Sequence, residues 1–96
     1  MDINNTMDKM SDFERKAEIL KAISHPIRLC IVKGLIEEEG KNVTNIQNCL
    51  GAPQSIISQH LSKLKAAGIV KGERSGVEIK YYVINDYVKE IIRIMF

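Results

Sequence analysis

The stretch from Pro53 to Lys65 carries short hydrogen-bonding side chains at helical spacing. They are Gln54, Ser55, Ser58 and Gln59, followed by Lys63. Amides and hydroxyls of this kind can match base edges in a DNA major groove, and a lysine beside them can meet a phosphate. None of these side chains suits catalysis by itself. An ordinary solvated helix would carry a similar face, so the flanking segments must decide between the two interpretations.

The opposite side of this stretch is apolar, with the period of an α-helix. Ile57, Leu61 and Leu64 stand at i, i+4 and i+7, which predicts a stripe that faces the core. The Gly-Ala-Pro break at residues 51–53 follows a shorter predicted helix that ends near Leu50. Two helices joined by about three residues that include a glycine are typical of a helix-turn-helix.

Two further helices are expected before this pair. Ser11 or Asp12 can cap the first, which ends near residue 24 because Pro26 disfavours helical geometry in the residue before it. Pro26 then opens a second helix, which runs to about Glu38 and is apolar on most sides, as expected for the middle of a domain. Residues 1–10 are polar and are expected to form a flexible N-terminus, so the predicted domain spans residues 11–96.

The period of the apolar residues changes to two after Gly68, which is a plausible helix C-cap. Residues 69–74 and 77–84 therefore predict a β-hairpin around Ser75-Gly76. Arg74 stands near its tip and Lys80 on its return strand. The order of elements predicts a mainly α fold with a β-hairpin, which is a winged helix-turn-helix.

A last helix, capped by Asn85 or Asp86 and reaching Phe96, has an apolar side too wide to be hidden in a monomer. A lone domain of 96 residues also has only a modest core. Both observations indicate a homodimer in which this helix lies beside the first one. The residues expected at the dimer interface are Phe13, Leu20, Tyr87, Ile91, Ile94 and Met95.

The net charge of +2 is small, but its distribution is informative. Residues 51–84 hold five basic and two acidic side chains, so the positive charge coincides with the segment suspected of touching nucleic acid. No apolar run approaches the roughly 18 residues of a membrane span, and no signal peptide is evident, so a cytoplasmic protein is expected. No phosphate-binding glycine loop or hydrolase pattern appears, and no enzyme is predicted.

Four motifs in register resemble the ArsR/SmtB family of winged-helix repressors over residues 13–96. They are residues 25–29 (His-Pro-Ile-Arg-Leu), residues 54–64, residues 67–70 (Ala-Gly-Ile-Val), and residues 74–76 (Arg-Ser-Gly) ahead of Tyr81-Tyr82. The resemblance implies a homodimer, joined through its first and last helices, that binds a palindromic double-stranded DNA operator. It also implies release by an inducer, which the sequence does not identify.

The resemblance also implies roles for individual residues. Gln54, Ser55, Ser58 and Gln59 match its base-reading positions, Lys63 a phosphate contact, and Arg74 and Lys80 the wing. His60 matches a position that packs between the helix and the core, and His25 is expected at a helix boundary. Arg28 is expected either at the DNA backbone or paired with glutamates.

The usual metal ligands of the family are missing from this sequence. Asn42 and Thr44 stand where metal sensors carry cysteines, and the last helix offers Asp86 and Glu90 without a histidine. Two carboxylates without imidazole make a poor transition-metal site, so no metal or other cofactor is expected.

Two alternatives stay open beside the DNA-binding regulator. Some relatives sense persulfides or oxidants through cysteine pairs, and Cys30 and Cys49 could serve as such a switch. The competing interpretation, which we favour, is that both are reduced residues buried in the core. The second alternative is a winged-helix module that docks a protein. Acidic residues on the recognition helix would favour that module, and none occurs between Pro53 and Ala67.

Overall fold

The computed structural model describes the backbone of residues 3–96 and the side chains of residues 9–96. Within this range the chain forms five helices and one antiparallel hairpin, so the predicted mainly α fold is confirmed. The elements are α1 (Ile3–Ile23), α2 (Pro26–Glu37), α3 (Val43–Leu50), α4 (Gln54–Ala66), β1 (Val70–Ser75), β2 (Glu78–Val83) and α5 (Asp86–Met95).

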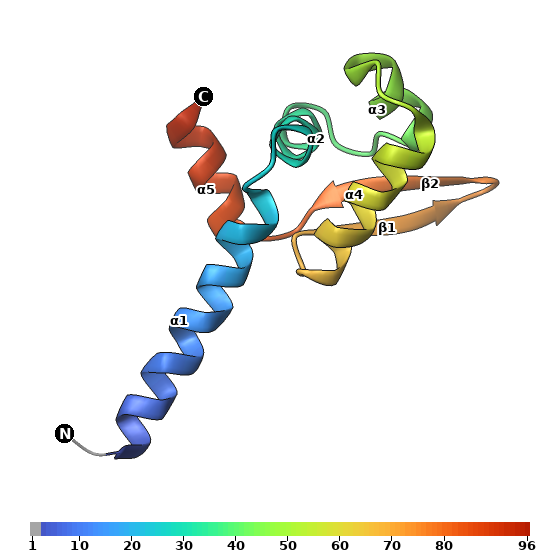
Figure 1. The fold of residues 1–96 in the computed structure, drawn as a ribbon. Helices are drawn as coiled ribbons and strands as arrows, with labels where there is room; N and C mark the ends of the chain where they lie inside the picture. Colours follow the sequence, from blue (N-terminus) through green and yellow to red (C-terminus); the bar gives the residue numbers. More distant parts are fainter. Residues whose placement is uncertain (1–2) are drawn as a thin grey trace.

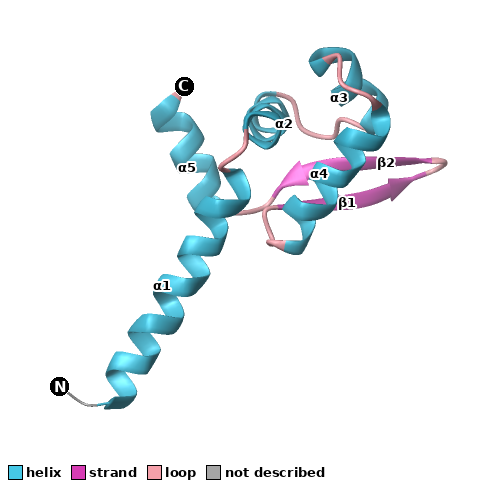
Figure 2. Cartoon of the chain, in the orientation of Figure 1, coloured by secondary structure: helices cyan, strands magenta, loops and turns pink. Residues whose placement is uncertain are grey.

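Helix α2 lies in the middle of the molecule, with α3, α4 and the hairpin on one side of it and α1 and α5 on the other (Figure 1). The N-terminal half of α1 extends away from the body, and the tip of the hairpin projects in a different direction (Figure 2). The described chain is therefore elongated, with extents of 52 × 29 × 20 Å.

The core is built around α2 and the inner face of α4. The predicted stripe of Ile57, Leu61 and Leu64 is buried, as are Ile31, Val32 and Leu35 of α2. The remaining buried side chains come from every other element: Ile23, Ile46, Ile69, Val70, Tyr81, Val83, Val88 and Ile92. Because its inner face is anchored in this core, α4 presents a defined outer face to solvent.

The end of α4 is set by a glycine. Gly68 has a φ of +73°, and its N–H donates to Lys65 O at 3.0 Å, while the N–H of Ile69 donates to Leu64 O at 3.0 Å. These two bonds form a Schellman motif, in which a left-handed residue satisfies the last helical carbonyls. The C-cap itself is Ala67, and Gly68, the predicted C-cap, is the left-handed residue directly after it, where the turn directs the chain into β1.

The hairpin turn lies one residue later than predicted. Val70 pairs with Val83 and Ser75 with Glu78, so the two-residue loop is Gly76-Val77, and the prediction of Ser75-Gly76 is wrong. Gly76 has a φ of +65°, which the first position of such a loop requires. Glycine takes this conformation without the steric cost that serine would meet, so Ser75 remains in the strand.

Helix α1 begins at Ile3, so the prediction that Ser11 or Asp12 starts it is wrong. Residues 3–10 contain no glycine or proline to stop a helix. Asp12 instead accepts a hydrogen bond from Lys16 Nζ at 2.7 Å, a spacing of one helical turn. Residues 1–2 lie outside the described residues, and the flexibility of residues 1–10 stays a prediction. Among residues 3–96, no helix has both the length and the apolarity needed to cross a membrane.

Candidate nucleic-acid interface

All four predicted base-reading residues lie on the exposed outer face of α4. Gln54 and Ser55 stand in its first turn, Ser58 and Gln59 one turn further on, and Lys63 is exposed near its end. These side chains project from a helix whose opposite face is fully buried. A rigid helix that displays short amides and hydroxyls is suited to hydrogen bonding with base edges.

Beside the shared apolar core, a polar contact joins α4 to α2 through His60 and Arg28. The guanidinium Nη1 of Arg28 donates to Nδ1 of His60 at 3.1 Å, and its Nε donates to Ala22 O at 2.5 Å. Among the described residues Arg28 therefore does not pair with a glutamate, which was one of its two expected positions. His60 is half-buried and acts as an acceptor at Nδ1, which requires the neutral ring with its proton on Nε2.

The charge environment of His60 favours that neutral ring. Partial burial lowers the pKa of His60, and the nearby positive groups of His25, Arg28 and Lys63 lower it further. The His25 ring lies 4.5 Å from the His60 ring, centroid to centroid. His25 also caps α2, because its Nδ1 accepts from the backbone N–H of Ile27 at 3.1 Å. The expected position of His25 at a helix boundary is thus confirmed.

The hairpin places its two predicted DNA-contacting cations outside the core. Arg74 is exposed on β1, and Lys80 is partly exposed on β2, opposite Glu73. Gly72 pairs with Tyr81, one position nearer the base of the hairpin than the Glu73–Lys80 pair, and a Cβ there would lie 2.9 Å from Ile79 Cγ2, so this strand position has little room for a side chain. The two paired strands project from the body as a wing that carries both cations.

The base of the wing is tied to the loop between α2 and α3. The N–H of Tyr81 donates to Lys41 O at 2.9 Å, and the N–H of Gly40 donates to Tyr81 O at 3.1 Å. Further along, Asn42 Nδ2 donates to Glu78 Oε1 at 3.0 Å. Local sequence patterns do not reveal these contacts, because residues 36 or more positions apart meet only after the hairpin folds back. Together they hold the wing against the helix-turn-helix.

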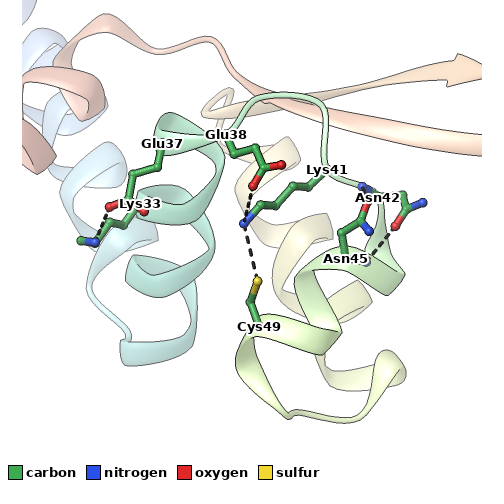
Figure 3. Close-up of polar contacts among 7 residues, drawn as sticks. All are labelled: Lys33, Glu37, Glu38, Lys41, Asn42, Asn45 and Cys49. Carbon is green, nitrogen blue, oxygen red and sulfur yellow. Dashed lines mark hydrogen bonds and ion pairs between the residues drawn. The ribbon is translucent and has the colours of Figure 1, made fainter.

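Both cysteines are exposed, so the prediction that they are buried core residues is wrong. Cys30 lies outside the buried stripe of α2, and Cys49 stands near the end of α3. The two line one cavity of about 190 Å³ between these helices. Lys41 Nζ lies 3.6 Å from Cys49 Sγ and 3.8 Å from Glu38 Oε2 (Figure 3).

The residues expected at a dimer interface form an apolar face on α1 and α5. Phe13, Leu20, Tyr87, Ile94 and Met95 are all more than half exposed in the single chain, and Ile91 is half-buried. Leu20, Tyr87 and Ile91 also line a small apolar cavity between the two helices. This cavity brings Leu20 of α1 together with Tyr87 and Ile91 of α5.

The positions of the family's metal ligands have other structural roles here. Asn42 caps α3 and accepts from the N–H of Asn45 at 2.8 Å, and Glu90 accepts from Arg93 Nη1 at 2.7 Å. Among the described residues, no three His, Cys, Asp or Glu side chains gather closely enough to hold a metal ion. The lack of a metal site stays a prediction.

A helix-turn-helix with an exposed polar second helix and a basic hairpin defines a winged-helix DNA-binding protein. The family model for bacterial regulatory proteins of the arsR family matches residues 25–71. An uncharacterised HTH-type transcriptional regulator of Methanocaldococcus jannaschii is 45% identical over 90% of this chain and 97% of its own. The protein therefore belongs to the arsR family, and it is a DNA-binding transcriptional regulator and not an enzyme.

Solved relatives share the whole architecture. The transcriptional repressor PagR of Bacillus anthracis is 40% identical over 97% of this chain and 92% of its own. Its crystal structure superposes with a TM-score of 0.84, covering 91% of this chain and 99% of PagR. A homodimeric winged helix-turn-helix DNA-binding domain from Mycobacterium bovis is 25% identical, with a TM-score of 0.81 and coverage of 91% and 80%.

Proposed function

We propose that this protein is a homodimeric repressor that binds a palindromic operator. The observation that carries the proposal is the outer face of α4, where Gln54, Ser55, Ser58 and Gln59 are exposed on a helix anchored in the core. These residues would read bases in the major groove. Such a regulator would act in the cytoplasm, where it meets genomic DNA.

The exposed apolar face of α1 and α5 supports the dimer. Phe13, Leu20, Tyr87 and Ile94 are all more than half exposed in the single chain, and a second copy would cover them. The homodimeric relative from Mycobacterium bovis supports the same assembly. A twofold axis would place the two copies of α4 in successive major grooves, about 34 Å apart, which is why a palindromic site is expected.

Backbone contacts would come from the cations beside the recognition face. Lys63 stands on the flank of α4, and Arg74 and Lys80 stand on the wing. Each phosphate that a cation neutralises adds about 0.9 to the magnitude of the slope when the logarithm of the binding constant is plotted against the logarithm of the salt concentration. The complex should therefore dissociate steeply with increasing salt.

Selection of bound fragments from genomic DNA, followed by footprinting, tests this proposal. The expected result is a twofold-symmetric site protected by one dimer, with at least a thousandfold preference over random DNA. A protein without sequence preference, or one that binds as a monomer, would contradict it. Capture of a protein partner in place of DNA would favour the alternative of a winged-helix module that docks a protein. Helix α4 contains no acidic residue, which does not support that alternative.

A thiol-responsive repressor is a second candidate, which the shared cavity of Cys30 and Cys49 favours. Diamide takes two electrons and two protons from two thiols and leaves a disulfide, so it probes this response directly. A switch predicts that the treated protein releases its operator and that Cys30→Ser or Cys49→Ser prevents the release. If treated and reduced proteins bind equally, the cysteines have no regulatory function of this kind.

A further inference from the structure

A cavity of about 670 Å³ opens between α1 and α4, beside the recognition face. Four basic side chains, Arg15, Lys21, Arg28 and Lys63, line it with a single acidic one, Glu18. These cations come from three different helices, so only the folded chain brings them together. The wall therefore carries a net positive charge at a place where the protein meets solvent.

Most of this charge has no acidic partner among the side chains that the structure describes. Arg15 lies 3.7 Å from Asp12, but the ion pairs found among residues 9–96 do not include Lys21, Arg28 or Lys63. Cations that share a small volume repel one another, and an anion from outside relieves that repulsion.

The guanidinium of Arg28 is held in place before any ligand arrives. Its Nε bonds to Ala22 O at the end of α1, and its Nη1 bonds to His60 on α4. The Nη2 amino group takes part in neither bond. A fixed guanidinium with a free amino group loses little conformational entropy when it binds an oxyanion, which favours a specific contact over a diffuse one.

We propose that this cavity seats a backbone phosphate of the operator, contacted by Lys21 and Arg28 together with Lys63. The inference rests on the proposed function, because it extends the same DNA interface from α4 to α1 and α2. Two observations select DNA as the occupant: the charge of the wall, and its continuity with the flank of α4 through Lys63. The hairpin tip points away from α1, so the phosphate-binding cavity and the wing would contact different parts of the operator (Figure 1).

Lys21→Met is the most specific test of this phosphate site, because Lys21 is exposed and takes no part in the Arg28 contacts. Binding is measured by fluorescence anisotropy as a function of KCl, on the operator and on random DNA. In a plot of the logarithm of the binding constant against the logarithm of the KCl concentration, the magnitude of the slope should fall by about 0.9 for each protomer, hence by about 1.8 for a dimer. Affinity should decrease by a similar factor on both DNAs, because a phosphate contact carries no sequence information.

Lys9→Met is the matched control, since it removes the same charge from the same helix about 18 Å away along the axis. It should leave the slope unchanged. An unchanged slope of the salt dependence in Lys21→Met, or an equal fall of that slope in Lys9→Met, would overturn the proposal of a phosphate site. A third result would also overturn the proposal: Lys21→Met abolishes the binding of free inorganic phosphate but leaves the salt dependence of DNA binding unchanged. The cavity would then hold a soluble anion and not a DNA phosphate. The operator preference of the wild-type protein tests the proposed function separately.

Discussion

Arg28 Nη1 lies 3.1 Å from His60 Nδ1, and this bond joins α2 to the recognition helix across 32 positions of the chain. The same guanidinium reaches Ala22 O at the end of α1. One side chain therefore connects a helix of the expected dimer interface with the helix expected to read DNA.

The Arg28–His60 bond should contribute measurably to stability. Arg28→Lys and His60→Phe, alone and combined, are expected to show a coupling energy of about 0.5–3 kcal/mol in urea denaturation, as contacting residues usually do. The exposed pair Arg93 and Glu90 is the control, and a surface pair of this kind couples by about 0.2–1 kcal/mol at most. Additive effects of the two Arg28–His60 substitutions would show that the contact adds nothing to stability.

Acid should weaken the fold through His60. Its pKa is lowered in the folded protein, so the unfolded chain binds more protons as the pH falls below the ordinary histidine value of about 6.5. The stability contribution of the neutral ring is fully present above that value and is lost toward the lower folded pKa. His60→Gln keeps an acceptor but cannot titrate. Urea midpoints measured at pH 7.5 and pH 5 should therefore differ less in the variant than in the wild-type protein.

Gln59 should discriminate between DNA sequences. Because its amide is exposed on the outer face of α4, Gln59→Ala is expected to weaken operator binding by about 1–3 kcal/mol and random-DNA binding far less. The salt slope should not change, since no phosphate contact is lost. Competition binding on both DNAs measures this, and an equal loss on the two would remove Gln59 from the base-reading set.

The apolar face of α5 should hold the dimer together. Ile94 is 83% exposed in the single chain, and Ile94→Glu would bury an unpaired charge in the interface. The variant is expected to sediment as a monomer at micromolar concentration and to lose operator binding. Val77→Glu makes the same chemical change at the fully exposed hairpin loop and should leave the dimer intact. A dimeric Ile94→Glu protein would place the interface elsewhere.

The left-handed turn after α4 should require its glycine. Gly68 has a φ of +73°, so Gly68→Ala is expected to destabilise the fold by about 1–2 kcal/mol in thermal or urea unfolding. Gly34→Ala provides the contrast, because Gly34 lies inside α2 and a Cβ there meets only Lys41 Nζ at 3.7 Å. That variant should gain up to about 1 kcal/mol. Equal destabilisation by both would contradict the assignment of the Schellman motif.

Local patterns accounted for most of the elements. The spacing of Ile57, Leu61 and Leu64 predicted which side of α4 is buried, and Pro26 predicted the start of α2. Signals of this kind work because helix period, capping and proline geometry act over only a few residues. The start of α1 was mispredicted for a related reason: Ser11 and Asp12 resemble caps locally, but a helix that has already begun continues through them.

The sequence by itself determined the order of helices and strands, the buried stripe of α4 and the polar residues left on its outer face. Only the tertiary structure decided which distant groups meet: Arg28 with His60, Asn42 with Glu78, and Lys21 with Lys63 around one cavity. It also decided that Cys30 and Cys49 face solvent. Periodicity reports how apolar a segment is, whereas exposure and long-range contacts depend on which neighbouring element packs against each face.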